Sequence, residues 1–196
     1  MEVCIVQRVL TPYAKNIEQF AWWEGAFTDE ELDILQAKAI AATGDSYIGK
    51  GVIDNEMRRT QLDWITNDSE FGWVFEKLAG VVSELNAQYF NFDLTGFGEA
   101  LQLGNYTAEE QGTYGWHQDF GGAGASRKLT AVLQLSDPAD YEGGNLEVLT
   151  SKEPESVRKQ RGLIISFPCW TVHRVTPVVK GARQTLVAWL SGKPFV

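Results

Sequence analysis

The spacing of hydrophobic residues predicts two amphipathic helices in the first half of the chain. Thr28-x-x-Glu31 has the form of a capping box, which marks the start of the first helix. The apolar positions of this helix recur at helical spacing and are Leu32, Leu35, Ala39 and Ala42. We expect the second helix to begin near Asn67 or Asp68, and both apolar stripes to face the core. The second stripe consists of Phe71, Val74, Phe75, Leu78, Val81, Val82 and Leu85.

Residues 46–64, between the two predicted helices, show no clear period. The segment contains Gly49, Gly51 and a polar stretch that includes Arg58 and Arg59. Two interpretations stay open, a pair of strands or a mobile flap. The two arginines are accordingly candidates either for reaching a functional site from this segment or for forming surface salt bridges.

From about residue 98 onwards the pattern changes to the two-residue period of β-strands. Leu129, Ala131, Leu133 and Leu135 alternate with Thr130, Val132 and Gln134. Turn signals occur at Asp137-Pro138 and Gly143-Gly144. Further strands are expected at 145–149, 162–167, 171–176 and 184–190. Helices followed by strands predict an α+β domain, or a β-sandwich with helices packed on one face.

Length, composition and charge narrow the class of protein. The 196 residues suit a single domain with one core, and 44% hydrophobic and 22% charged residues are typical of a soluble globular protein. A net charge of −9 opposes binding to phosphate backbones, so no nucleic-acid partner is expected. No apolar run reaches the ~20 residues of a membrane helix, and the N-terminal segment lacks the form of a secretory signal. We therefore expect a cytoplasmic protein that contacts no membrane. Cys4 and Cys169 indicate two reduced thiols rather than a disulfide framework.

The two histidines of the chain, His117 and His173, carry the strongest candidate chemistry. Each lies in a segment expected to be a strand or a strand end. Asp119 follows His117 by two residues, so on an extended backbone both side chains point to the same side and can reach one metal ion. His173, 56 residues later (173 − 117 = 56), could add a third ligand from a distant strand. Two imidazoles and one carboxylate with open positions form the facial triad of non-haem iron(II) oxygenases.

A His-x-Asp pair alone is weak evidence for a metal site, and Arg183 strengthens it. Arg183 lies ten residues after His173 (183 − 173 = 10). A guanidinium can bind a carboxylate through two parallel hydrogen bonds. Arg183 could therefore hold the far carboxylate of a dicarboxylic cosubstrate whose other end chelates the metal. The alternative is a surface arginine in a turn.

Several longer motifs surround these residues. They are Tyr114-Gly115-Trp116-His117-Gln118-Asp119, Ser136-Asp137-Pro138-Ala139-Asp140-Tyr141-Glu142-Gly143-Gly144-Asn145-Leu146, Phe167-Pro168, His173-Arg174-Val175-Thr176-Pro177-Val178, Gly181-Ala182-Arg183 and Trp189. With these motifs the chain resembles the 2-oxoglutarate- and iron(II)-dependent dioxygenases of the prolyl 4-hydroxylase type, most closely their bacterial PKHD-type branch. The resemblance covers roughly residues 98–192 and is weaker over the first hundred residues.

The resemblance implies a fold and a set of metal ligands. The fold is a mainly β (α+β) double-stranded β-helix, or jelly roll, of the cupin-like kind. One domain would span residues 1–196, with a β-helix core over about 96–196 and supporting helices within about 1–95. His117, Asp119 and His173 match the iron ligands of the family.

The resemblance also implies a pocket for the cosubstrate. Arg183 matches the residue that binds the distal carboxylate of 2-oxoglutarate, and Tyr106 matches a tyrosine that lines the pocket. In animal relatives a further tyrosine helps to hold the same carboxylate. This chain has Gln134 at the corresponding position, and the glutamine amide can still donate a hydrogen bond. Thr130 shares a strand face with Gln134, so we expect both to enter the pocket together or not at all.

The implied activity uses Fe(II), 2-oxoglutarate and dioxygen, with ascorbate as a candidate accessory cofactor. It hydroxylates a C–H bond of a prolyl or other residue in a peptide or protein, or of a free amino acid, and converts 2-oxoglutarate into succinate. Asp119 favours hydroxylation, because family members that halogenate lack this carboxylate. Two alternatives stay open, a cupin-like metal enzyme that does not use 2-oxoglutarate and a jelly-roll binding module without catalysis.

Overall fold

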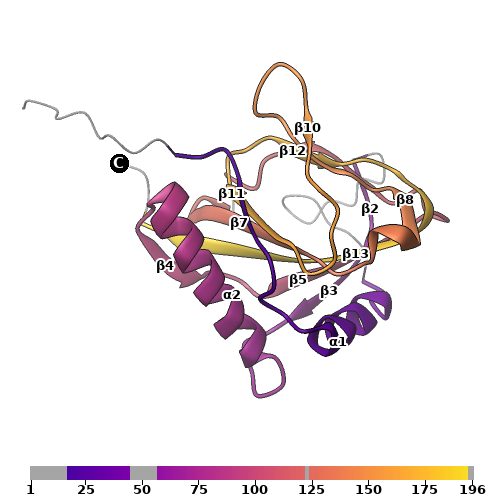
Figure 1. Ribbon diagram of the computed structural model, residues 1–196, viewed down its shortest axis with the longest axis horizontal. Helices are drawn as coiled ribbons and strands as arrows, with labels where there is room; N and C mark the ends of the chain where they lie inside the picture. Colours follow the sequence, from indigo (N-terminus) through magenta and orange to yellow (C-terminus); the bar gives the residue numbers. More distant parts are fainter. Residues whose placement is uncertain (1–16, 45–56, 122–123, 194–196) are drawn as a thin grey trace, which may run out of the picture.

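The computed structural model describes residues 17–44, 57–121 and 124–193, and within them the strands form two antiparallel sheets (Figure 1). Side chains from both sheets line a cavity between them. The larger sheet has the order β1 (Ala21–Trp23), β11 (Ile164–Pro168), β7 (Arg127–Gln134), β13 (Val178–Gly192), β5 (Leu101–Thr107) and β3 (Gln61–Ile65). β4 (Leu94–Phe97) and β8 (Tyr141–Gly143) also pair with β13. The smaller sheet has the order β10 (Glu155–Ser156), β9 (Leu146–Val148), β12 (His173–Val175), β6 (Thr113–His117) and β2 (Arg58–Arg59).

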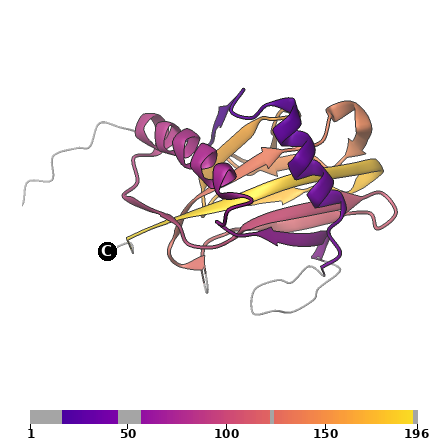
Figure 2. The same cartoon turned by 90° about the horizontal axis from the view of Figure 1, so that it is seen from below.

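Helices cover the outer face of the larger sheet (Figure 2). α1 spans Asp29–Ile40, α2 spans Gly72–Leu85, and a π-helical turn over Asn86–Phe90 extends α2. Their apolar side chains form one core with the outward-facing residues of β5, β7 and β13. Both apolar stripes expected from the sequence are buried, and all of their residues except Ala42, which lies beyond the end of α1, belong to this core. Within the described residues, neither helix combines the length and the apolar character that crossing a membrane requires.

The two helices begin in different ways. Thr28 caps α1 as predicted, because its Oγ1 accepts a hydrogen bond from the Glu31 amide (3.3 Å) and Glu31 Oε2 accepts one from the Thr28 amide (2.8 Å). The predicted start of α2 near Asn67 or Asp68 is wrong, since the helix begins at Gly72. Asp68 lies instead in a turn before the helix. Its Oδ1 accepts hydrogen bonds from the backbone amides two and three residues further along the chain, at 2.9 and 3.0 Å.

The region expected to supply supporting helices also contributes strands to both sheets. β1 pairs with β11, β3 pairs with β5, and β2 pairs with β6. The C-terminal part of the segment 46–64 therefore forms strands, as one of the two interpretations expected. Residues 45–56, on which the flap interpretation depends, lie outside the described residues.

β7 follows the alternation expected from the sequence, with both of its faces buried. Leu129, Ala131 and Leu133 pack into the core beneath the helices. Thr130 and Val132 point to the opposite side, where they line the cavity between the sheets. This central strand thus separates the helical core from the candidate site.

Candidate metal centre

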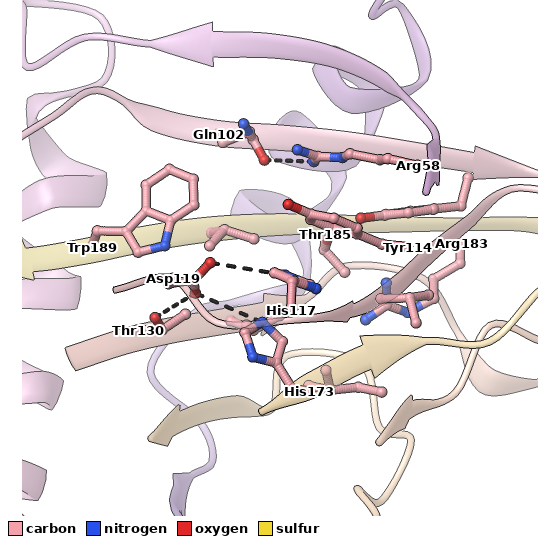
Figure 3. Close-up of a pocket in the computed structure, with 15 residues that line it drawn as sticks. Arg58, Gln102, Tyr114, His117, Asp119, Thr130, His173, Arg183, Thr185 and Trp189 are labelled. Carbon is pink, nitrogen blue, oxygen red and sulfur yellow. Dashed lines mark hydrogen bonds and ion pairs between the residues drawn. The ribbon is translucent and has the colours of Figure 1, made fainter. Parts of the chain in front are cut away.

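His117, Asp119 and His173 converge in the cavity between the two sheets (Figure 3). β6 and β12 are neighbours in the smaller sheet, and the two histidines face each other in their antiparallel register. His117 Nε2 lies 3.8 Å from Asp119 Oδ1, and His173 Nε2 lies 3.7 Å from Asp119 Oδ2. One ligand atom from each residue lies within 4.8 Å of the other two. The fold thus brings together the three residues that the sequence proposed as ligands.

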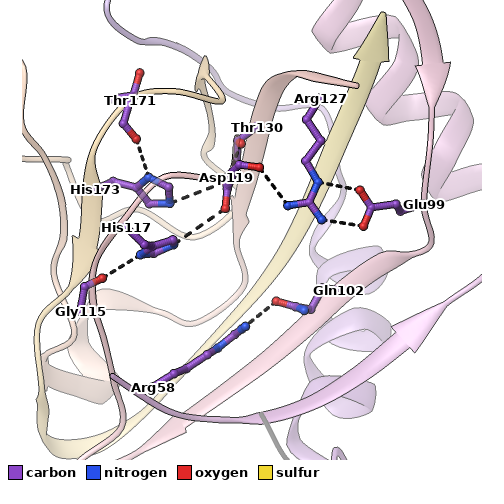
Figure 4. Close-up of polar contacts among 10 residues, drawn as sticks. All are labelled: Arg58, Glu99, Gln102, Gly115, His117, Asp119, Arg127, Thr130, Thr171 and His173. Carbon is purple, nitrogen blue, oxygen red and sulfur yellow. Dashed lines mark hydrogen bonds and ion pairs between the residues drawn. The ribbon is translucent and has the colours of Figure 1, made fainter. Parts of the chain in front are cut away.

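Backbone carbonyl groups fix the orientation of both imidazoles (Figure 4). His117 Nδ1 lies 2.7 Å from the Gly115 carbonyl oxygen, and His173 Nδ1 lies 2.9 Å from the Thr171 carbonyl oxygen. Because a carbonyl oxygen only accepts hydrogen bonds, each Nδ1 carries the proton. In the neutral form of either ring, Nε2 is then the nitrogen whose lone pair is available to a metal ion beside Asp119.

The Asp119 carboxyl group is held in its ionised form. Burial raises its pKa, but the neighbouring His173 and His117 and a hydrogen bond from Thr130 outweigh this effect, and the net pKa lies below its usual value. The Thr130 hydroxyl donates to Asp119 Oδ2 at 2.6 Å. The indole N–H of Trp189 faces the same carboxyl group and lowers its pKa further.

The His117 imidazole is held in its neutral form. Burial, followed by the neighbouring His173, lowers the pKa of His117 to about 3. On one face, the ring of Tyr114 stacks on the imidazole with 3.5 Å between centroids. The guanidinium of Arg58 lies 4.4 Å from the centroid of that Tyr114 ring. A neutral imidazole can bind a metal without first losing a proton.

The chemistry of this donor set fits Fe(II). Two imidazole nitrogens and one carboxylate oxygen form the 2-His-1-carboxylate set, which leaves the remaining positions of the ion for other ligands. Among the described residues, this is the one cluster of three or more His, Cys, Asp or Glu side chains whose ligand atoms lie so close together. The centre is buried, since the three side chains are only 7–10% exposed.

Arg183 and Tyr106 line the same cavity as the metal-ligand candidates. They face each other across the β13–β5 pair, and the Arg183 guanidinium lies 5.4 Å from the Tyr106 ring centroid. Arg183 is buried, with 2% of its surface exposed. Gly144 allows this packing, because a Cβ there would lie 3.0 Å from Arg183 Cδ and the backbone φ of +57° suits glycine.

Gln134 corrects one of the expectations for the cosubstrate pocket. Thr130 lines the cavity, but Gln134 does not, so the prediction that both enter together or not at all is wrong. The Gln134 side chain is buried, and its Nε2 donates a 2.8 Å hydrogen bond to the Arg158 carbonyl oxygen. The segment before β11 therefore occupies the Gln134 amide at this end of β7.

The cavity also separates the two arginines that the sequence offered as candidates for reaching a site. Arg58 lines the cavity, whereas Arg59 donates to the Gln111 carbonyl oxygen at 3.2 Å near the surface. Trp189 and Gln102 also line it. These last two were not proposed as site residues from the sequence. Strand period could have identified both, because Trp189 lies six residues after Arg183 on β13 and Gln102 lies four residues before Tyr106 on β5, each an even spacing on one face.

The C-terminal half of the chain matches a known family and several curated relatives. Residues 101–191 match the model of the 2OG-Fe(II) oxygenase superfamily. A PKHD-type hydroxylase of Prochlorococcus marinus is 38% identical over 79 residues, which are 40% of this chain and 36% of that relative. One of Hyphomonas neptunium is 38% identical over 86 residues, which are 41% of this chain and 38% of the relative. The chain thus spans well under half the length of these relatives, and the matched region confirms the resemblance seen in the motifs.

Solved structures confirm the jelly-roll fold. A prolyl hydroxylase from Trichoplax adhaerens superimposes with a TM-score of 0.75 at 15% identity. It was solved in complex with a peptide fragment of the oxygen degradation domain of hypoxia inducible factor. The match covers 88% of this chain and 83% of the other. A Pseudomonas putida prolyl-4-hydroxylase gives a TM-score of 0.72 at 18% identity, with 88% and 92% covered. At these identities the likeness is one of fold.

Proposed function

Because residues 101–191 match the model of the 2OG-Fe(II) oxygenase superfamily, we propose that this protein hydroxylates a C–H bond in a reaction that requires Fe(II), 2-oxoglutarate and dioxygen. One observation carries the proposal. Two imidazoles and one carboxylate, with ligand atoms within 4.8 Å of one another, line the same cavity as a buried arginine. The two imidazoles and the carboxylate suit a metal ion. The buried arginine suits one carboxylate of a dicarboxylic cosubstrate.

His117, Asp119 and His173 would hold the iron. When bound, iron with 2-oxoglutarate supplies the chemistry that activates dioxygen, oxidises the substrate and converts the cosubstrate into succinate and carbon dioxide. The protein contributes oriented ligands, because Gly115 and Thr171 fix the imidazole rings. Burial of the three side chains limits the access of water to the metal.

Arg183 would bind the far carboxylate of 2-oxoglutarate, with Tyr106 beside it. A guanidinium that is only 2% exposed has lost most of its hydration, and an anion bound next to it compensates for that loss. Thr130 lines this cavity, and its hydroxyl also donates to Asp119. It would therefore orient a metal ligand, and cosubstrate contact by Thr130 stays a prediction.

The substrate would be a prolyl or other residue in a peptide or protein, or a free amino acid. The names of the matched relatives support hydroxylation, and the Trichoplax neighbour was solved with a peptide. Asp119 also supports hydroxylation over halogenation, because it fills the coordination position that a halide would need. Ascorbate would act as an accessory reductant.

A succinate-release assay with purified protein tests the proposal. Succinate should form only when Fe(II), 2-oxoglutarate and a substrate from a panel of proline-containing peptides and free amino acids are all present. His117→Ala and Asp119→Ala should abolish substrate-coupled turnover, and Arg183→Ala should raise the 2-oxoglutarate requirement about 100-fold or more. Arg161→Ala, a control outside the cavity, should leave that requirement unchanged. Omission of ascorbate should shorten the active lifetime.

Three outcomes would contradict the proposal. Turnover that persists after replacement of His117, Asp119 and Arg183 together would exclude the assigned roles. Metal-dependent turnover without 2-oxoglutarate would favour a cupin-like metal enzyme. A protein that binds no stoichiometric iron would be a non-catalytic binding module.

A further inference from the structure

Asp119 lies beyond the end of β6, so no strand ladder fixes its backbone. Two tertiary hydrogen bonds hold it instead. The Asp119 amide donates to the Cys169 carbonyl oxygen at 2.9 Å, and the Asp119 carbonyl oxygen accepts from Arg127 Nη1 at 3.2 Å (Figure 4). The direction of this candidate ligand therefore depends on a side chain at the start of β7.

Arg127 reaches Asp119 by a second route through an aromatic ring. The guanidinium carbon of Arg127 lies 4.0 Å from the Trp189 ring centroid. Trp189 lines the metal cavity, and the nitrogen of its indole ring lies on the side toward Asp119 (Figure 3). One guanidinium thus contacts the backbone of Asp119 and also the ring beside the Asp119 side chain.

Glu99 fixes the Arg127 guanidinium in this position. Arg127 Nε donates to Glu99 Oε1 and Arg127 Nη2 donates to Glu99 Oε2, both at 2.6 Å. This bidentate pair occupies the edge of the guanidinium that does not face Asp119. All three nitrogens and one face of the group are therefore engaged, which leaves the arginine little rotamer freedom.

We propose that Arg127, locked by Glu99, is a positioning residue for the Asp119 carboxylate in the metal centre. The proposal rests on the proposed function, because it assumes that Asp119 is a metal ligand. A surface salt bridge alone would contribute little to stability and nothing to metal affinity. Outer contacts that orient a ligand, in contrast, typically change metal affinity by about 10- to 100-fold when they are removed.

A metal-binding experiment tests the proposal independently of enzymatic turnover. The metal-free protein is titrated with Mn(II) under anaerobic conditions, and electron paramagnetic resonance measures the free Mn(II). Arg127→Met keeps much of the side-chain bulk but removes the hydrogen bonds to Asp119 and Glu99. It should weaken Mn(II) binding about 10- to 100-fold. Arg127→Lys should recover part of the affinity, because an ammonium can reach a carbonyl oxygen but cannot form the bidentate pair.

Arg161→Met is the matched control. Arg161 Nε donates to the Leu135 carbonyl oxygen at 3.0 Å, and Arg161 Nη2 donates to Asp33 at 2.5 Å. Arg161 therefore also joins a backbone carbonyl group to a carboxylate, but these contacts lie at the end of β7 and on α1 and not with the metal ligands. Its replacement should lower thermal stability and leave Mn(II) affinity within about twofold of wild type.

Glu99→Gln keeps the proposal testable if Arg127→Met does not fold. This variant retains Arg127 and loses one charge, and it should weaken Mn(II) binding severalfold. Wild-type affinity in Arg127→Met or, failing that variant, in Glu99→Gln would overturn the inference while the proposed function stands. A wild-type protein that binds no Mn(II) and no Fe(II) would overturn the proposed function and this inference with it.

Discussion

The Thr130 hydroxyl donates a 2.6 Å hydrogen bond to Oδ2 of Asp119, the same carboxylate oxygen that lies 3.7 Å from His173 Nε2. A side chain of the larger sheet thereby orients a ligand next to a strand of the smaller sheet. The contact is short because its acceptor is ionised, and such bonds contribute about 1.5–3 kcal/mol. Thr130 thus connects the two layers at the point where the metal would bind.

Thr130→Val should weaken metal binding. Valine has nearly the same shape but cannot donate, so one oxygen of the Asp119 carboxylate loses its orienting partner and the pKa of Asp119 rises. We expect the affinity for Fe(II) or Mn(II) to fall about 10-fold, as measured by anaerobic calorimetric titration. Thr130→Ser, which keeps the hydroxyl group, should bind almost as tightly as wild type. Equal affinities of the valine and serine variants would show that the hydrogen bond does not orient the ligand.

Gln134→Ala should affect stability more than cosubstrate binding. The Gln134 amide donates to the Arg158 carbonyl oxygen and does not line the cavity. Loss of this buried donor should lower the free energy of unfolding by about 1–3 kcal/mol in urea titrations. The concentration of 2-oxoglutarate for half-maximal succinate release should stay within about twofold of wild type. A large rise in that concentration would place Gln134 at the cosubstrate after all.

The metal-free protein should lose stability as the pH falls below about 6.5. Burial, with the neighbouring His173 second, lowers the pKa of His117 from 6.5 to about 3 in the folded state. The unfolded chain therefore binds a proton at this site at a higher pH than the folded chain does, and acidification favours unfolding. Urea unfolding in the presence of a chelator, from about pH 7 to about pH 4, measures this dependence.

His117→Gln is the comparison for the pH dependence. Its side chain does not titrate, so its free energy of unfolding should change less over the same range. The lowered pKa of Asp119 acts in the same direction as His117, but only below its usual value of 3.8. Parallel pH curves for wild type and His117→Gln would contradict the assignment of the dependence to His117.

The Cys169 thiol should react slowly with thiol reagents in the native protein. Burial, with the charge of Asp119 second, raises the pKa of Cys169 to about 11. The thiol also donates a hydrogen bond to the Arg127 carbonyl oxygen at 2.9 Å. At about pH 8 only ~0.1% of such a thiol is ionised, and the thiolate is the reactive form.

A disulfide reagent that releases a coloured thiolate measures the reactivity of Cys169. Cys4 lies outside the described residues, so the assay uses a Cys4→Ser background. We expect slow reaction in the native state and one rapid equivalent after denaturation in urea. Rapid stoichiometric reaction of the native protein would show that Cys169 is exposed.

Local sequence pattern determined much of the architecture. The capping box at Thr28 and the helical stripe behind it define α1, because both depend on residues within one or two turns of each other. Alternation predicted β7, and the two-residue spacing of His117 and Asp119 placed both side chains on one side of the chain. Residue chemistry, supported by the family motifs, then pointed to His173 and Arg183, which line the same cavity.

Tertiary structure decided what local pattern leaves open. His117 and His173 lie side by side because the register between β6 and β12 pairs these two residues, which are 56 positions apart (173 − 117 = 56). Gln134 shares the strand face of Thr130, but the segment before β11 occupies its amide and keeps it from the cavity. The sequence alone therefore identified the ligand types and their local direction, while long-range packing determined which side chains reach the metal, because burial and register depend on residues far apart along the chain.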